Sequence, residues 1–436
     1  MQQVQKTAVD FLKKYEMDFE ELDIDSNVRV FIDEMAQGLA GQKSSLEMLP
    51  TYMQVDTDVP ANKPVIVMDA GGTNFRVATV WFDENKKPTI ENFRLFPMPG
   101  IEKEVGKDEF FRIILGYVRD ILDKAKNVGF CFSYPTEILP SKDGKLINFS
   151  KEIKAGQVHG QVIGENLNHA IATAGAGENK HVVLLNDTVA TLLAGRDNKN
   201  RIFDGYVGFI LGTGTNCCYV EKNSNITKKK GLDAAGSQIV NIESGGFGKC
   251  RQGKIDILFD QTTTNPGVHT FEKMISGGYL GALCLKVIQT AADEGLFSKG
   301  VADSLNATKK LETKELSDFL YYPETGDNPL AVSCKNGRPD DVTKLYCLAE
   351  RLVERAAKQT AMNLSTAAIK SDKGKEPNRP ICFVAEGTTF YHLKGLRSKV
   401  EYYLKDYLER QRQIYYDIIS VENATLIGAA IAGLTN

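Results

Sequence analysis

The chain has 436 residues, and at roughly 150 residues per domain we expect two domains. Its composition, 42% hydrophobic and 25% charged, is typical of a folded globular protein and excludes a largely disordered one. The 53 basic and 56 acidic side chains leave a net charge of −3, which provides no broad positive field for nucleic acid or an anionic membrane. We therefore expect neither as a partner.

No stretch reaches the roughly 18 consecutive apolar residues of a membrane span. The first residues include several acidic side chains and no apolar core, which argues against a secretory or organelle-targeting peptide and predicts a cytoplasmic protein. The eight cysteines form no CxxC pair, so we expect buried, reduced thiols and neither a disulfide framework nor a metal cage. The number of subunits stays open between a monomer and a homodimer.

Strands and helices are predicted to alternate through the first half of the chain. An amphipathic helix opens it, because Val4, Ala8 and Phe11 recur at helical spacing. Further elements are expected as strand, Gly-Gly turn and strand at 64–82, helix at 110–124, buried strand at 128–135, helix at 162–174, and strand-like runs at 182–195 and 206–222. This alternation predicts an α/β architecture.

The second half is predicted to be more helical. Its long periodic segments are 267–289 and 343–369, and a last strand is expected at 381–385. The ending, residues 425–434, is apolar and rich in small residues, which fits a closely packed terminal helix better than a membrane segment. Three consecutive lysines, 228–230, are interpreted as a solvated turn.

A short motif occurs twice, as DAGGTN at 69–74 and LGTGTN at 211–216, each time between two β-rich arms. The repetition suggests two related halves. Glycine lets a backbone come close to a ligand, and consecutive free N–H groups bind anions, so two such turns on facing domains would hold a polyphosphate. Each could equally be a plain hairpin turn. The sequence contains no P-loop or dinucleotide-binding motif that would offer a competing phosphate site.

Several polar residues surround these motifs. Asp187 follows an apolar strand and precedes a helical run, which places it where open α/β sheets bind ligands, although a helix cap is the alternative. Other candidates are Ser133, Lys151, Asn216, Glu243 and Glu272. Taken together, these patterns indicate an ATP-binding α/β protein.

Seven segments in order resemble the hexokinase family of the actin-like ATPase fold. They are DAGGTNFR (69–76), SYP (133–135), SK (150–151), NDT (186–188), LGTGTN (211–216), IESGGFG (242–248) and NPGVHTFEKMISGGYLG (265–281). The resemblance implies a two-domain actin-like ATPase (ribonuclease H-like) fold with an interdomain cleft. It implies a small domain at 61–186, to which a C-terminal helix at 425–436 returns, and a large domain formed by 1–60 and 187–424.

The resemblance also implies an activity, the transfer of the γ-phosphoryl of MgATP to the 6-hydroxyl of a hexose, glucose first among them, as the first step of glycolysis. Asp187 would be the general base and Lys151 a second catalytic residue. The implied sugar ligands are Ser133, Tyr134, Ser150, Lys151, Asn186, Asp187, Asn216, Glu243 and Glu272. The implied nucleotide ligands are Asp69, Gly71, Gly72, Thr73, Asn74, Arg76, Gly212, Thr213, Gly214, Thr215, Gly387, Thr388 and Thr425. Mg²⁺ would be carried mainly by ATP, with Asp69 nearby and no dedicated metal cage.

The sequence departs from the family pattern in four places. Glu386 stands for the usual aspartate and Ile427 for a lysine, both near the expected adenosine site. Ser244 replaces a tryptophan and Tyr134 a phenylalanine, which bears on the preferred sugar. The alternative functions are a catalytically inactive sugar sensor and, disfavoured by SYP and NPGVHTFEKM, a filament-forming or chaperone-like actin relative.

Overall fold

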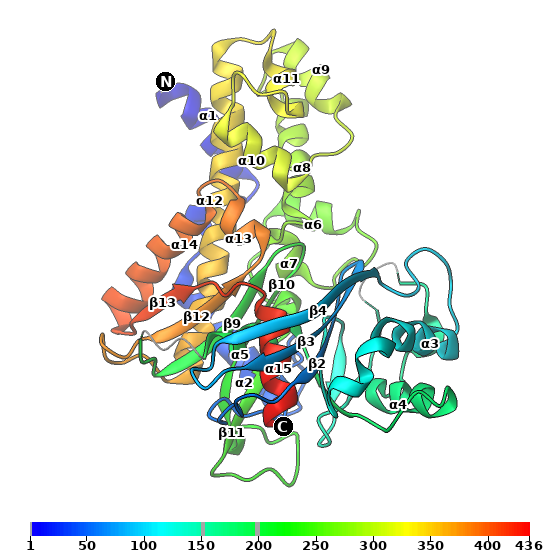
Figure 1. Cartoon of the computed structure of the whole chain (residues 1–436). Helices are drawn as coiled ribbons and strands as arrows, with labels where there is room; N and C mark the ends of the chain where they lie inside the picture. The colour runs from blue at the N-terminus through cyan, green and yellow to red at the C-terminus, as the bar shows by residue number, and fades with distance from the viewer. Residues whose placement is uncertain (1, 150–152, 197–200) are drawn as a thin grey trace.

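The computed structural model describes residues 2–149, 153–196 and 201–436. Two β-sheets lie side by side below a tall group of helices, and the N-terminus lies at the helical end (Figure 1). The C-terminus lies beside the sheets. Two of the predicted site residues, Ser150 and Lys151, fall outside the described residues.

The smaller sheet has five strands in the order β4-β3-β2-β5-β8. Its strands are β2 (Val65–Gly71), β3 (Asn74–Phe82), β4 (Pro88–Pro97), β5 (Asn127–Phe132) and β8 (His181–Leu185). Side chains alternate between its two faces. Ile66 and Met68 pack with helices α3 (Lys107–Val118) and α4 (Ile163–Thr173), whereas Val65 and Val67 pack with helix α15 (Ala424–Thr435). Because apolar side chains alternate between the two faces, helices cover both faces of the sheet.

The larger sheet has six strands in the order β1-β11-β10-β9-β12-β13. Its strands are β1 (Leu49–Pro50), β9 (Gly205–Leu211), β10 (Thr215–Lys222), β11 (Ser237–Asn241), β12 (Ile381–Glu386) and β13 (Tyr416–Ile419). The long helix α12 (Pro339–Ser371) packs on β10 and β9, and α2 (Ile24–Leu39) packs on α12. Helix α5 (Asp187–Gly195) contacts β9, β10 and β12.

The two sheets share one topology. In each, three neighbouring strands are antiparallel and two parallel strands follow, so β4-β3-β2-β5-β8 corresponds to β11-β10-β9-β12-β13. The two glycine motifs occupy equivalent turns, between β2 and β3 and between β9 and β10. The internal repeat predicted from six letters thus extends over five strands of each sheet, and β1 at the edge of the larger sheet has no counterpart.

Helices α5 and α15 pack against each other between the two sheets. Their contact depends on small residues, because a Cβ at Gly428 of α15 would collide with the carbonyl oxygen of Ala190 in α5. On its other side, α15 lies so close to β5 that a Cβ at Gly129 would collide with the carbonyl of Ala429. The predicted close packing of the terminal helix is therefore confirmed, and no helix within the described residues has the length and apolarity to cross a membrane.

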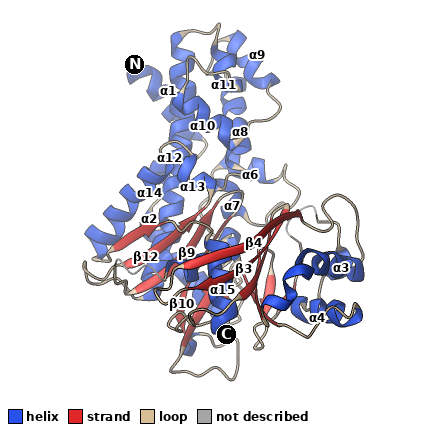
Figure 2. Ribbon diagram, viewed as in Figure 1, coloured by secondary structure: helices blue, strands red, loops and turns tan. Residues whose placement is uncertain are grey.

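Most of the remaining elements are helical and form the tall end of the molecule (Figure 2). The helices are α1 (Gln2–Lys14), α6 (Lys254–Asp260), α7 (Thr270–Ile275), α8 (Leu280–Asp293), α9 (Lys299–Ala307), α10 (Thr313–Tyr321), α11 (Pro329–Cys334), α13 (Thr388–His392) and α14 (Leu396–Leu404), with a small hairpin, β6 (Thr136–Ile138) and β7 (Gly144–Leu146), elsewhere. Short 3₁₀ turns lie at Phe19–Glu21, Arg119–Lys124, Gly156–Val158, Asn223–Asn225 and Ser244–Gly246, and a π-helical turn lies at Lys405–Arg410. The predicted helical segment at 267–289 is two helices with a break at 276–279.

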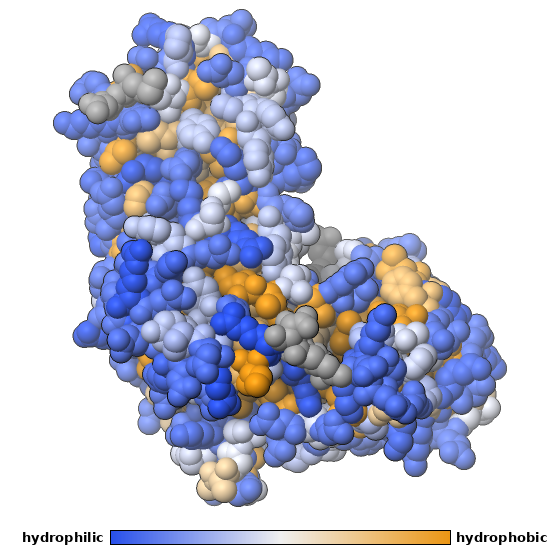
Figure 3. All heavy atoms as spheres, turned by 60° about the vertical axis from the view of Figure 1, so that its left-hand side comes forward, coloured by the Kyte–Doolittle hydropathy of each residue, from blue (hydrophilic) through white to orange (hydrophobic). Residues whose placement is uncertain are grey.

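The molecular surface is mostly hydrophilic on the face drawn in Figure 3, and apolar residues gather in its hollowed middle. Seven of the eight cysteines are buried, and Cys347 is half-buried. All eight are free thiols. The interpretation of the cysteines as buried hydrophobic residues therefore fits seven of them.

Candidate active site

The first glycine turn, residues 71–74, joins β2 to β3. Gly72 has φ +65°, a conformation that glycine adopts without strain, and Thr73 and Asn74 at the tip are exposed. Just before the turn, the carboxylate of Asp69 is nearly buried, with 4% of the residue exposed. The hydroxyl of Thr425 donates to Asp69 Oδ2 at 2.9 Å, and Arg76 Nη1 lies 3.3 Å from the same oxygen. Three predicted nucleotide ligands thus meet at one carboxylate.

The second glycine turn, residues 211–215, joins β9 to β10 and is held from outside. The Gly277 N–H donates to the Gly212 carbonyl at 2.8 Å, and the Gly278 N–H donates to the Thr213 carbonyl at 2.9 Å. A Cβ on either Gly277 or Gly278 would lie only 2.8 Å from the oxygen that its N–H bonds. This contact explains why the predicted helix breaks at 276–279, and sequence reasoning did not identify it.

The third predicted nucleotide segment, residues 386–388, lies against the second turn. Gly387 directly follows β12 and has φ +115°, and a Cβ there would collide with the carbonyl of Leu211. Thr389 Oγ1 donates to the Gly212 carbonyl at 2.9 Å, while Thr388 is exposed at the start of α13. The segment around Gly387 therefore lies against the second glycine turn, and its role at the nucleotide stays a prediction.

Asp187 is the first residue of α5, directly after the end of β8. The cap of this helix is Asn186, whose side-chain oxygen accepts from the N–H of Thr188 at 2.9 Å. The same N–H lies 2.9 Å from Asp187 Oδ1. The alternative interpretation of Asp187 as the helix cap is wrong, because the cap is Asn186 and Asp187 is the first helical residue. Its position directly after the end of β8 is the one expected for a ligand-binding residue, and that role stays a prediction.

Three side chains from neighbouring strands form a hydrogen-bonded cluster beside Asp187. Asn216 Nδ2 donates to Asn241 Oδ1 at 2.8 Å and to Glu243 Oε1 at 3.2 Å, and Asn241 Nδ2 donates to Glu243 Oε1 at 2.8 Å. Glu243 has a left-handed backbone, with φ 57°, which is uncommon for a residue with a Cβ and is found at functional sites. Asn241 was not among the predicted ligands; its only signal in the sequence is that it lies two residues before Glu243, at the end of β11.

Burial raises the pKa of Glu243 to about 7, even though part of the residue reaches solvent. Hydrogen bonding from Asn241 opposes this effect, and the charges of Asp187 and Glu272 add to it. Glu272 Oε2 in turn accepts from the Thr215 N–H of the second turn at 2.9 Å. Three carboxylates therefore share one space, which suits a neutral ligand with many hydroxyl donors.

Cys131 connects this group to the first turn. Burial raises the pKa of its thiol well above the usual range, and the charges of Asp69 and then Asp187 raise it further. The two aspartates therefore lie near one buried, neutral sulfur atom. Asp69 lies just before the first turn, and Glu272 accepts from an N–H of the second turn. The group of acidic residues therefore extends from one turn to the other.

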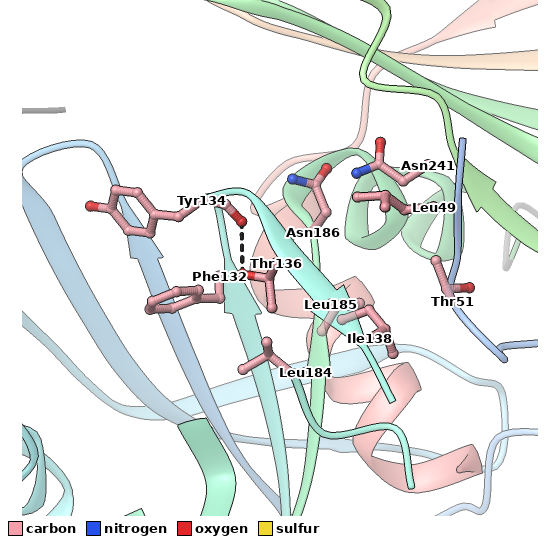
Figure 4. Close-up of a pocket in the computed structure, with 10 residues that line it drawn as sticks. All are labelled: Leu49, Thr51, Phe132, Tyr134, Thr136, Ile138, Leu184, Leu185, Asn186 and Asn241. Carbon is pink, nitrogen blue, oxygen red and sulfur yellow. Dashed lines mark hydrogen bonds between the residues drawn. The ribbon is translucent and has the colours of Figure 1, made fainter. Parts of the chain in front are cut away.

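Residues 133–135 contact the end of β2 and the turn that follows it. The Ser133 N–H donates to the Ala70 carbonyl at 3.0 Å, and the Tyr134 hydroxyl donates to the Gly72 carbonyl at 2.9 Å. A small cavity of about 10 Å³ lies between Tyr134, Asn186 and Asn241, where the side-chain amides of the two asparagines are on one side (Figure 4). The ring of Tyr134 points away from the asparagines.

Two family models, both described as hexokinase, match residues 8–196 and 206–435. Human Hexokinase-3 is 31% identical over 309 residues, which are 68% of this chain and 32% of that protein. Horse (Equus caballus) Hexokinase-2 is 31% identical over 373 residues, 79% of this chain and 40% of that protein. The chain thus spans between a third and two fifths of the length of these curated relatives.

The solved structure of a hexokinase from Schistosoma mansoni in complex with glucose matches with a TM-score of 0.79, at 24% identity, over 99% of both chains. A ROK hexokinase from Thermus thermophilus matches with a TM-score of 0.50, at 15% identity, over 85% of this chain and 97% of that one. These similarities show the fold. The chain has the two-domain actin-like ATPase architecture that the resemblance implied.

Proposed function

The chain belongs to the hexokinase family, and from this premise we propose that it transfers the γ-phosphoryl of MgATP to the 6-hydroxyl of a hexose. The product is a hexose 6-phosphate, as in the first step of glycolysis, and glucose is the first candidate substrate. The observation that carries the proposal is the convergence of Asp187, Glu243 and Glu272, with Glu272 bonded to the second glycine turn. Asp187, which would accept the hydroxyl proton, thereby lies near the second glycine turn, whose backbone would hold phosphates.

We assign to Asp187 the role of general base, which accepts the proton of the attacking hydroxyl. Phosphoryl transfer needs an oxygen held in line, a base for its proton and stabilisation of charge on the transferred group, with little covalent help from the protein. General-base catalysis contributes about 10²–10⁴-fold in rate. The start of α5 fixes the Asp187 backbone, because Asn186 caps the helix, and the Thr188 N–H, 2.9 Å from Asp187 Oδ1, orients the carboxylate.

The sugar ring is assigned to the polar cluster. Hydroxyls that donate to a carboxylate are worth about 1.5–3 kcal/mol each, and Glu243 and Glu272 both offer such oxygens. The remaining assigned ligands are Ser133, Ser150, Lys151, Asn186 and Asn216, with Tyr134 contributing through its backbone, and we add Asn241 as the residue that orients Glu243. Lys151 keeps its expected catalytic role as a prediction.

The nucleotide phosphates are assigned to the two glycine turns. The exposed Thr73, Asn74 and Thr213 lie at the tips of these turns, where backbone amides reach solvent and a ligand. Arg76 and Asp69 lie below the first turn, and Asp69 offers an oxygen of the kind that Mg²⁺ prefers. When bound, Mg²⁺ supplies positive charge to the phosphates. That Mg²⁺ is carried mainly by ATP stays a prediction.

We further propose the small domain at 61–186 with residues 425–436, and the large domain at 1–60 and 187–424. Closure of the first domain over bound sugar would exclude water, which competes with the hexose for ATP. The packing of α15 on β2 and β5 supports the return of the C-terminal helix to this domain. A cytoplasmic location, and a monomer or homodimer, remain predictions from the sequence.

A coupled assay for ADP tests the proposal. The protein is supplied with MgATP and, in turn, glucose, mannose, fructose and an amino sugar, and hexose binding is measured separately by calorimetry. We expect turnover with at least one hexose. Asp187→Asn should abolish turnover while hexose affinity stays within about tenfold, whereas Asp120→Asn, at an exposed aspartate paired with Arg94, should change neither. Hexose binding without ADP would identify a sugar sensor, and undiminished turnover of Asp187→Asn would remove that residue from the mechanism.

A further inference from the structure

Tyr134 has a hydroxyl where the SYP segment departs from the phenylalanine of the family pattern. In the structure this hydroxyl donates to the Gly72 carbonyl in the first glycine turn at 2.9 Å. The side chain was expected to line the sugar pocket, but its ring points away from Asn186 and Asn241 (Figure 4). The added oxygen therefore acts on the backbone of the phosphate turn.

The tyrosine ring is held firmly enough to orient its partner. Only 2% of Tyr134 is exposed, and its ring centroid lies 5.0 Å from those of both Phe132 and Phe149. The backbone beside it is also fixed, because the Ser133 N–H donates to the Ala70 carbonyl at 3.0 Å. Two hydrogen bonds in succession thus attach residues 133–134 to the end of β2 and to the turn that follows it.

The Gly72 carbonyl matters because it shares a peptide plane with the Thr73 N–H. In a planar trans peptide the C=O and N–H point in opposite directions, so fixing the carbonyl towards Tyr134 directs the Thr73 N–H away from it. The far side of Thr73 is fixed as well, since its carbonyl accepts from the Met98 N–H at 2.9 Å. The amide at the exposed tip of the turn is therefore aimed before any ligand arrives.

We propose that Tyr134 is a positioning residue, which holds the Gly72–Thr73 peptide so that the Thr73 amide binds a nucleotide phosphate. This inference rests on the proposed function, because it assigns the first turn to phosphate. The SYP segment, which was expected to contact the sugar, would then also act on the nucleotide. We expect the effect on nucleotide affinity and transfer, because the phenol donates to the Gly72 carbonyl of the turn and the ring points away from Asn186 and Asn241.

Tyr134→Phe tests this inference, because it removes one oxygen atom and keeps the ring. We expect kcat/KM for MgATP to fall about two- to tenfold, which is what one neutral hydrogen bond is worth, with KM for the hexose unchanged. The Kd of a non-hydrolysable ATP analogue with Mg²⁺, measured by calorimetry, should rise by the same factor. Tyr416→Phe is the matched control, because it removes a hydroxyl that donates to the Glu401 carbonyl at 3.0 Å in the larger sheet. It should leave both quantities unchanged.

Unchanged nucleotide kinetics and affinity in Tyr134→Phe would overturn the inference, as would an equal change in KM for the hexose and for MgATP. A wild-type protein that binds hexose but makes no ADP would overturn the proposed function alone. In that case the Kd of the ATP analogue still decides whether Tyr134 positions the turn. Thermal unfolding of both variants near the wild-type midpoint would show that the fold is intact.

Discussion

Replacing Glu243 by glutamine should stabilise the protein, and more so at higher pH. Burial, reinforced by the charges of Asp187 and Glu272, raises the pKa of Glu243 from 4.5 to about 7. In the unfolded chain the same carboxyl ionises near its ordinary pKa, so between these two values the folded state keeps a proton that the unfolded state has lost. Folding stability therefore falls as the pH rises from about 4.5 to about 7, and the full penalty is present above pH 7.

The size of this penalty follows from the two pKa values. At about 1.4 kcal/mol per pH unit, ionising Glu243 in the fold costs up to about 3 kcal/mol at pH 8, and roughly 1 kcal/mol at pH 5. Glutamine removes the charge and keeps an oxygen that accepts from Asn216 and Asn241, so the variant should recover most of this energy. For 436 residues, an unfolding entropy of about 2.1 cal/mol/K per residue converts it into an increase in Tm of about 3 °C.

Thermal unfolding of the hexose-free protein between pH 5 and pH 8 measures the effect. Glu178→Gln, at an exposed glutamate, is the control and should show no gain that depends on pH. The same Glu243→Gln variant should bind hexose about 10- to 100-fold more weakly, because a charged acceptor is lost. A variant that is no more stable than wild type at pH 8, or whose gain is the same at pH 5 and pH 8, would refute the electrostatic reasoning.

Two glycine substitutions test the packing around the site. Gly428→Ala should destabilise the protein by about 1–3 kcal/mol or more in chemical denaturation, because its Cβ would meet the Ala190 carbonyl, whereas Gly116→Ala, in open space on α3, should stabilise it by about 0.5–1 kcal/mol. Equal effects at the two positions would contradict the proposed close approach of α15 to α5. Gly278→Ala should raise KM for MgATP, because its Cβ would lie 2.8 Å from the Thr213 carbonyl and displace the second turn. A larger effect on the hexose KM than on the MgATP KM would count against that assignment.

The repeat and the glycine turns could be predicted from the sequence because their signals are local. A turn that requires φ +65° at Gly72 favours glycine whatever surrounds it, and the β-branched arms on each side indicate strands. The α/β class and the terminal helix followed from periodicity in the same way. The sugar and nucleotide ligands depended on the family resemblance, because single carboxylates such as Glu243 and Glu272 have no local signature.

The contacts between distant segments could not be predicted. The Gly277 and Gly278 amides interrupt a periodic helical segment because they bond a turn more than 60 residues earlier in the chain, as the partners Gly212 and Thr213 show. The lysine run at 228–230 was interpreted as solvated, yet Lys229 pairs with a glutamate 92 residues away, at 3.0 Å. Amino-acid patterns report local backbone preference, whereas these contacts depend on which segments the two sheets bring together.

The two glycine turns have the same place in the repeated topology but are held in different ways. The second turn is held by the backbone N–H groups of Gly277 and Gly278 and by two side chains, Thr389 on the Gly212 carbonyl and Glu272 on the Thr215 N–H. The first turn is held by the Tyr134 hydroxyl and the Met98 N–H, and the Asp69 carboxylate before it receives the hydroxyl of Thr425 from the C-terminal helix. Substitutions of Tyr134 or Thr425 therefore act on the first turn, and substitutions of Thr389 or Glu272 act on the second. If the two turns share one triphosphate, its affinity depends on side chains from four separate segments of the chain.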